Sequence, residues 1–215
     1  RDSVVQEITP SGELIFEWDS WGKLNLDNCL IHRWPDDYAH LNSVSIASDG
    51  NLILSLRGCS QVIKVDRDTG ETIWILGGAG NNDFEIVGDP FEEFCGQHTA
   101  FETSSGNIGM FDNGGYCNGD REETFGQFSR YVEYRLDFEA SQAHFVKDYS
   151  LYNENEWYTA SGGSVQELGE DSMLINWARV TTVSATEVVD SEVVRSFRLS
   201  WDGRPVRTYR FYKLP

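Results

Sequence analysis

The stretches V-V-Q-E-I-T-P-S-G-E-L-I-F-E-W (residues 4–18) and Q-V-I-K-V-D-R-D-T-G-E-T-I-W (residues 61–74) are two versions of one pattern. In each, a short run rich in β-branched residues is followed by a polar turn with Gly and then by a second run that ends in Trp. Such runs, separated by turn residues, are typical of β-hairpins. The turn glycines, Gly12 and Gly70, lie 58 residues apart, so the same hairpin recurs at a long period.

A second kind of hairpin alternates with the first. It has a turn between two apolar runs, and it occurs at S-V-S-I-A-S-D-G-N-L-I-L-S-L (43–56), T-A-F-E-T-S-S-G-N-I-G-M-F (99–111) and S-V-Q-E-L-G-E-D-S-M-L-I-N-W (164–177). Later runs that can repeat the first kind are Tyr131–Leu136 with His144–Tyr149, and Ser196–Leu199 with Val206–Tyr212.

Two hairpins per repeat make a unit of four strands with a period somewhat above about fifty residues, which is typical of a β-propeller blade. A jelly roll or a sandwich is the competing all-β architecture, but neither predicts paired hairpins that resemble each other at this spacing. The sequence therefore predicts an all-β chain with one β-propeller domain over residues 1–215. We expect the outer hairpin of one blade at 1–20 and four-stranded blades near 40–77, 98–150 and 160–212.

About three and a half blades cannot close a ring, and an open array would leave strand edges unpaired. We therefore expect the remaining propeller blades to come from upstream sequence, from a second cleaved chain or from a neighbouring subunit.

The net charge of the chain argues against nucleic acid as a binding partner. The chain carries 17 basic and 35 acidic residues, a formal net charge of −18, and such a field repels nucleic-acid phosphates. No apolar run reaches the roughly 18 residues that a membrane-spanning helix needs. Acidic loops such as residues 83–89 could hold Ca²⁺, but their spacing matches no defined calcium loop, so we expect no cofactor.

The four cysteines are Cys29, Cys59, Cys95 and Cys117, and no two of them form a C-x-x-C pair. This spacing argues against a zinc ribbon or a thioredoxin-like motif. Of the three possible pairings, we expect Cys95–Cys117 and Cys29–Cys59. A disulfide-bonded chain is expected outside the cytoplasm, as a secreted, extracellular or periplasmic protein.

Six motifs occur in one order through this repeat: H-L-N-S-V (40–44), L-S-L-R (54–57), T-G-E-T-I-W-I-L-G-G (69–78), G-Q-H-T-A-F (96–101), G-N-I-G-M-F-D-N-G (106–114) and G-S-V-Q-E-L (163–168). In sequence and order they resemble the aryl-sulfate sulfotransferase family, and the resemblance spans nearly the whole chain. The resemblance implies a six-bladed propeller with its active site at the central channel. It also implies transfer of sulfate from an aryl sulfate to a phenol, without a nucleotide sulfate donor.

The same resemblance assigns the site residues. His98 corresponds to the histidine that attacks sulfur and becomes sulfated, His40 to a companion histidine, and Arg57 to the arginine that binds the sulfuryl oxygens. A neutral imidazole is a competent nucleophile near pH 7, and a planar guanidinium can bond two of the charged oxygens. A second histidine can supply the proton that a phenolate leaving group needs.

The predicted strands bring these residues together. His40 and His98 each precede an inner hairpin, and Arg57 ends the hairpin that His40 begins, so we expect all three at the channel mouth. Each also has a structural alternative, which is a bond between blades for the histidines and a salt bridge for Arg57. We assign no role to His32 and His144. We expect Asp112 to be structural, and Trp18, Trp74 and Trp177 to lie in the core between blades.

The chain departs from the family at the nucleophile motif. The common form is H-D-A-R, whereas this sequence has H-T-A-F with Thr99 and Phe101, which removes one charge pair beside His98. The acidic segment 117–127 could in addition cover the channel. These features leave an alternative function open, that of a non-catalytic propeller that serves as a binding or structural module of an extracellular assembly.

Overall fold

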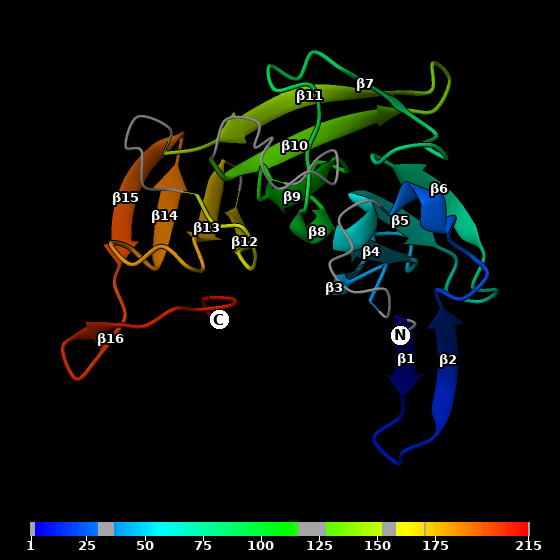
Figure 1. Cartoon of the computed structure of the whole chain (residues 1–215), viewed down its shortest axis with the longest axis horizontal. Coiled ribbons are helices and arrows are strands. Elements are labelled where there is room, and N and C mark those ends of the chain that lie inside the picture. Colours follow the sequence, from blue (N-terminus) through cyan, green and yellow to red (C-terminus); the bar gives the residue numbers. More distant parts are fainter. Residues whose placement is uncertain (1–2, 30–36, 116–127, 152–157, 170, 215) are drawn as a thin grey trace.

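The computed structural model describes residues 3–29, 37–115, 128–151, 158–169 and 171–214. The prediction of an all-β chain is confirmed, because the described residues form strands and only two short 3₁₀ turns, η1 (Leu26–Asn28) and η2 (Arg57–Cys59). The strands belong to antiparallel sheets that follow one another along an arc in chain order (Figure 1).

The first two sheets have the predicted hairpins. Strands β1 (Val4–Ile8) and β2 (Leu14–Asp19) pair with each other alone. The second sheet has four strands in chain order: β3 (Leu41–Ile46), β4 (Leu52–Leu56), β5 (Gln61–Val65) and β6 (Thr72–Leu76). The hairpins predicted within residues 43–56 and 61–76 are therefore confirmed.

The third sheet contains β8 (His98–Glu102), β9 (Ile108–Asp112), β10 (Arg130–Asp137) and β11 (Gln142–Tyr149). Its β8–β9 and β10–β11 hairpins were both predicted. A fifth strand, β7 (Glu85–Val87), pairs in parallel with β11 at the outer edge and was not predicted, since three residues carry no periodicity signal.

The fourth sheet contains β12 (Ser164–Gly169), β13 (Ser172–Asn176), β14 (Ala185–Val189) and β15 (Glu192–Phe197). The expected pairing of Ser196–Leu199 with Val206–Tyr212 is wrong, because β14 and β15 form the outer hairpin. Their two-residue turn, Asp190–Ser191, has positive φ at both positions, which is the type I′ geometry that matches the twist of a hairpin. Beyond it, β16 (Ser200–Trp201) and β17 (Arg204–Pro205) form a small separate ribbon.

Three apolar clusters fill the spaces between successive sheets, and each contains one of the three tryptophans predicted to be core. Trp18 packs with the second sheet, Trp74 lies in the cluster between the second and third sheets, and Trp177 lies between the third and fourth. All three side chains are buried. Packing between the faces of neighbouring sheets therefore stabilises the array.

The first strands of the second, third and fourth sheets, β3, β8 and β12, lie side by side. Between β3 and β8, Ser45 Oγ donates to Ala100 O at 3.0 Å and Ala100 N donates to Ser43 Oγ at 3.1 Å. Between β8 and β12, Thr99 Oγ1 donates to Gly163 O at 3.1 Å. Because these strands are adjacent, the residues at which they begin meet at one end of the array.

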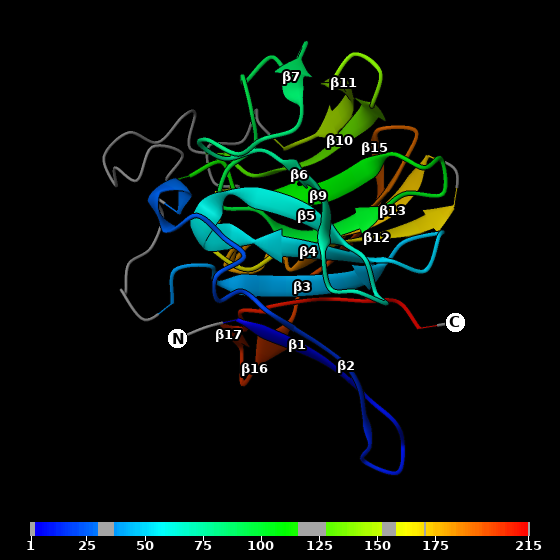
Figure 2. The same cartoon turned by 90° about the vertical axis from the view of Figure 1, so that its right-hand side faces the viewer.

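The C-terminal segment 206–214 returns to these first strands. Ser164 Oγ on β12 accepts from Phe211 N at 3.2 Å, and Gln166 Oε1 accepts from Lys213 N at 2.8 Å. Arg210 Nη2 donates to the backbone oxygen of Asn42 on β3. Figure 2 shows this segment, in red, passing beneath β3.

The disulfide prediction is confirmed for Cys29–Cys59, whose sulfur atoms are 2.02 Å apart. This bond ties the loop after β2 to η2, which begins with Arg57. Cys95 is also disulfide-bonded. Its expected partner, Cys117, lies outside the described residues, as do the acidic segment 117–127 and His32.

Candidate active site

His98 is the first residue of β8, and its side chain is buried, with 1% of its surface exposed. Both ring nitrogens have partners. Nδ1 lies 2.7 Å from Oδ1 of Asn113, which directly follows β9, and Nε2 accepts the backbone N–H of Gly162 at 3.1 Å. The three residues come from three segments that the adjacent sheets bring together.

The hydrogen bonds assign the tautomer of His98. Asn113 Nδ2 donates to Thr159 O at 2.7 Å and to Gly162 O at 3.0 Å, so its Oδ1 is the atom that faces the imidazole. An amide oxygen only accepts, so Nδ1 of His98 carries the proton. Nε2 therefore carries the lone pair in the ring plane, in agreement with the Gly162 N–H, which donates to it.

Burial keeps His98 neutral. Loss of hydration lowers its pKa from an ordinary value of 6.5 to about 3, and the nearby charges of Arg57 and His40 also lower it, while the hydrogen bond to Asn113 opposes the shift. At neutral pH the imidazole therefore holds an unprotonated Nε2, which is the form that a nucleophile requires.

This pKa predicts how stability depends on pH. Between pH 3 and 6.5 the unfolded chain binds a proton at His98 that the folded chain does not, so this contribution to stability is full above pH 6.5 and is lost as the pH falls toward 3. The stability advantage of wild type over His98→Gln is expected to be about 2 kcal/mol smaller at pH 5 than at pH 7. Urea unfolding of both proteins at the two pH values measures it, and a difference independent of pH would contradict it.

Arg57 lies opposite His40, as predicted. It follows β4 directly as the first residue of η2, and its backbone N–H donates to His40 O at 3.2 Å. Its guanidinium Nη2 donates to Ala160 O at 3.0 Å, in the loop that also contacts His98. Its positive charge is therefore close enough to His98 to lower the pKa of the imidazole.

His40 directly precedes β3 and is more accessible than His98, with 42% of its side chain exposed. Its Nδ1 lies 2.6 Å from Oδ2 of Asp37, which holds the ring in place and leaves Nε2 on the other side. His40 has a φ of 48°, in the left-handed region, and Thr99 after His98 has a φ of 51°. Such backbone is rare outside glycine and is often found at functional sites.

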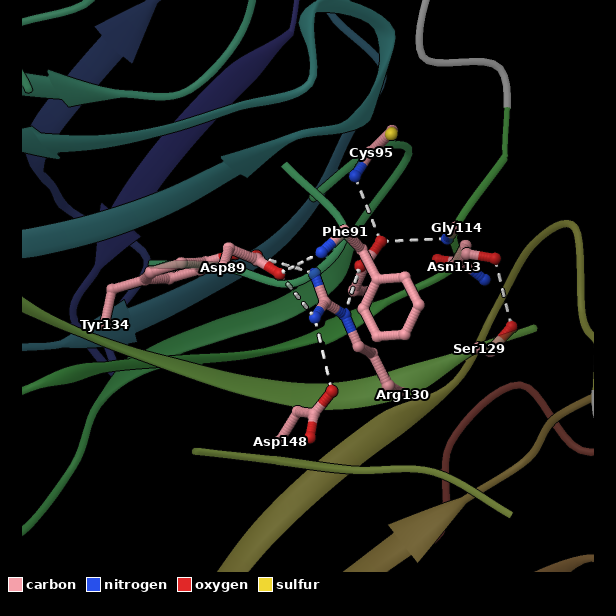
Figure 3. A network of polar contacts seen from close by, with 10 residues as sticks. Asp89, Phe91, Cys95, Asn113, Gly114, Ser129, Arg130, Tyr134 and Asp148 are labelled. Carbon is pink, nitrogen blue, oxygen red and sulfur yellow. Dashed lines mark hydrogen bonds and ion pairs between the residues drawn. The ribbon is translucent and has the colours of Figure 1, made fainter. Parts of the chain in front are cut away.

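A buried ion-pair network lies behind this site (Figure 3). Arg130, the first residue of β10, has no exposed side-chain surface, and its Nε donates to Asp112 Oδ2 at 2.9 Å. Its Nη1 and Nη2 donate to both oxygens of Asp89 at 2.9 and 2.8 Å, and Nη1 also reaches Asp148 at 3.3 Å. The hydroxyl of Tyr134 donates to Asp89.

The network shifts the ionisation of its members. Burial raises the pKa of Asp112, against the attraction of Arg130, whereas the bonds from Arg130 outweigh burial at Asp89 and lower its pKa. The carboxylates in turn hold the pKa of the Arg130 guanidinium above its ordinary value despite burial. Asp112 Oδ1 accepts from Cys95 N at 3.0 Å and from Gly114 N at 2.8 Å. It therefore joins the segment before His98 to the turn that contains Asn113.

With this geometry established, the comparisons identify the family. The family model for arylsulfotransferases (ASST) matches residues 1–211. The chain belongs to the arylsulfotransferase family.

One solved structure resembles the arylsulfotransferase chain in fold, and a second matches it more weakly. A protein of unknown function from Bacteroides caccae matches with a TM-score of 0.55 and 11% identity over 91% of this chain and 59% of that one. A catalytically inactive H270A virginiamycin B lyase from Staphylococcus aureus with quinupristin matches with a TM-score of 0.46 and 9% identity over 92% and 50%. The arylsulfotransferase chain thus spans between half and three fifths of the length of these structures. No curated protein matches it.

The two departures from the common motif have structural contacts in this arylsulfotransferase. Thr99 holds the loop before β12 through Gly163 O, and Phe101 packs against the cluster between the third and fourth sheets. Gly163 itself has a φ of 106°, and a Cβ there would lie 2.4 Å from the ring of Phe111. Glycine at this position therefore lets the loop before β12 pass directly against the ring of Phe111.

A cleft of about 260 Å³ lies between β3, β8 and β12, with Arg210 and Tyr212 of the C-terminal segment in its lining. Its lining is mainly apolar and includes Val44, Phe101, Val165, Arg210 and Tyr212.

In the described part of the chain, no three His, Cys, Asp or Glu side chains are grouped to hold a metal ion. In the acidic loop 83–89, Asp83 accepts from Ile75 N at 2.7 Å and Asp89 binds Arg130. No helix among the described residues is long and apolar enough to cross a membrane.

Sequence reasoning missed Asn113, which follows Asp112, a residue expected to be structural. It also missed Arg130 and the loop Thr159–Gly163. The one available signal was the G-M-F-D-N-G motif itself, whose Asn occurs where the motif resemblance is strong.

Proposed function

We propose that this arylsulfotransferase moves a sulfuryl group from an aryl sulfate to a phenol, without a nucleotide donor, through a sulfated His98. Membership of the family supports sulfuryl transfer in general. The observation that supports the histidine route is a buried, neutral imidazole whose Nε2 accepts from Gly162 N–H, in the same loop whose Ala160 O is bound by the guanidinium of Arg57.

In the first step the Nε2 lone pair of His98 attacks sulfur. An N–S bond forms, the S–O bond to the aryl group breaks, and the phenolate leaves with the electron pair, taking a proton from His40. In the second step the acceptor phenol attacks sulfur and gives its proton to His40. The N–S bond then breaks and its electron pair returns to Nε2.

Arg57 is the group that stabilises the sulfuryl oxygens in this proposal, because a guanidinium offers two parallel donors to a charged oxygen pair. In the present conformation Arg57 is bonded to Ala160 O and Nε2 of His98 is bonded to Gly162 N–H. Attack on sulfur requires the Gly162 bond to break. Substrate therefore displaces the loop Ala160–Gly162 from both residues.

We further propose that the sheets are blades of a six-bladed propeller whose other blades lie outside this chain. The two-stranded first sheet exposes Val4, Ile8 and Ile15, and the last sheet exposes Val193 and Val194 on β15. Blades from upstream sequence or from another chain would cover these apolar residues. The Cys29–Cys59 disulfide supports a secreted or periplasmic location.

The test uses intact protein that includes the missing blades, a chromogenic aryl sulfate and a phenol acceptor, with no nucleotide present. We expect release of the chromogenic phenol that depends on the acceptor, with formation of the new aryl sulfate. Turnover only with a nucleotide sulfate donor, or binding of aryl sulfate without any turnover, would contradict the proposal. The second outcome would instead favour a binding module.

A further inference from the structure

The side chain of Asn113 connects His98 to the loop that contains Thr159 and Gly162. Its side chain is 1% exposed, and both ends of its amide are hydrogen-bonded. Oδ1 accepts from His98 Nδ1, and Nδ2 donates to Thr159 O and to Gly162 O. A rotated amide would place Oδ1 against two carbonyl oxygens. The orientation of this amide is therefore fixed by the two carbonyls and does not depend on His98.

The backbone on both sides of Asn113 is also fixed. Asn113 O accepts from Ser129 Oγ at 3.1 Å, and Asp112 Oδ1 accepts from Gly114 N, while Asp112 is held by Arg130 (Figure 3). Gly114 has a φ of 65°, and a Cβ there would lie 2.2 Å from Phe128 O. The buried network thus supports a turn that has one conformation.

We infer that Asn113 is a positioning residue that holds His98 in the Nδ1–H tautomer, so that the sulfuryl group bonds to Nε2 and not to Nδ1. The inference rests on the proposed function, because it names which nitrogen of the proposed nucleophile reacts. A free imidazole exchanges its proton between the two nitrogens. In the protein the amide oxygen accepts only from a protonated Nδ1, so the lone pair is placed on Nε2, the nitrogen that faces the loop through Gly162 N–H.

The amide also suits both steps of the reaction. When Nε2 bonds to sulfur, the ring keeps the Nδ1 proton and becomes cationic, and Oδ1 of Asn113 continues to accept that proton. Because the amide is neutral, it does not hold the cation as strongly as a carboxylate would. The imidazole therefore remains a good leaving group in the second step, when the N–S bond breaks and Nε2 regains its electron pair.

The first test reads the tautomer directly and needs no activity. The intact protein is labelled with ¹⁵N-histidine, and the couplings of each ring nitrogen to the ring protons identify the protonated one, with His98→Gln used to assign the signal. We expect Nδ1–H in wild type. A proton on Nε2 in wild type would overturn the inference even if the variants below fail to fold.

Two substitutions separate positioning of His98 from support of the loop. Asn113→Ala removes every side-chain bond, whereas Asn113→Asp keeps an acceptor for Nδ1 but cannot donate to Thr159 O or Gly162 O. We expect Asn113→Ala to lose the tautomer preference. We expect Asn113→Asp to keep Nδ1–H and to titrate at higher pH than wild type, because its carboxylate favours the protonated ring. Loss of Nδ1–H in both folded variants, or in neither, would overturn the inference.

The second test measures kcat and KM of the same variants. Asn113→Ala is expected to lower kcat about 10²- to 10⁴-fold while KM changes by less than about threefold, since the tautomer affects the chemical step. Asn113→Asp is expected to recover part of kcat and to shift the acid limb of its pH profile upward. Asn107→Ala, in the turn between β8 and β9 where the half-buried Asn107 donates to Glu133, is the matched control and should behave as wild type. If wild type proves inactive while its tautomer is Nδ1–H, the proposed function fails and the positioning of His98 stands.

Discussion

Replacing His98 by Gln is expected to lower kcat for transfer between aryl sulfate and phenol by about 10⁴-fold or more, because no other group can form the covalent intermediate. Gln is close to His in size, and its amide can still contact Asn113 and Gly162. The loss is therefore a loss of chemistry, with the fold retained. Steady-state assay of the intact protein with a chromogenic donor measures it.

His144→Gln is the matched control, since His144 lies in β11 on the outer hairpin, opposite Arg135. Its kcat is expected to stay within about twofold of wild type, as for surface substitutions in general. If His98→Gln retained a kcat within about tenfold of wild type, the nucleophile would have to be another residue.

Replacing Arg130 by Met is expected to lower the free energy of unfolding by about 3–5 kcal/mol. Met fills much of the same volume, but Asp89 and Asp112 are left without the cation that compensates their burial. Uncompensated carboxylates can regain stability by binding protons, so the loss is expected to be largest near neutral pH and to shrink as the pH falls. Urea unfolding at pH 7 and pH 5 measures both effects.

Arg135→Met lies on the same strand but is exposed, and it is the control, with an expected change within about 0.5 kcal/mol. A loss below about 1 kcal/mol in Arg130→Met at pH 7 would mean that the network is not important to stability. The further expectation is that Arg130→Met also impairs turnover, because Asp112 and the turn at Asn113 are bonded to one another and to the segment before His98.

Much of the fold could be predicted because its signals are local. Alternation of apolar residues and turn glycines such as Gly12 and Gly70 gave most hairpins, and a Trp in three repeats gave the core between sheets. The outer hairpin of the last sheet was misplaced because its turn, Asp190–Ser191, has no glycine and left the run 185–197 without a visible break.

Only the site residues that lie within the family motifs could be predicted from the sequence. The backbone N–H of Arg57 donates to His40 O, and the charges of both residues act on the pKa of His98, while their roles in a site stay a prediction. Their partners could not be predicted, because Asn113 and Gly162 lie 15 and 64 residues from His98 and meet it only through packing of three sheets. Arg130 likewise binds Asp89, which lies 41 residues earlier in the chain.

The central claim is tested most directly by trapping the intermediate. Intact protein is mixed with excess aryl sulfate and no acceptor, quenched in alkali and digested, and the peptide that contains His98 is analysed by mass spectrometry while released phenol is counted. We predict a burst of about one phenol per protein and one sulfuryl group on His98, both absent from His98→Gln. A burst with the sulfuryl group on another residue, or turnover without any covalent adduct, would contradict it.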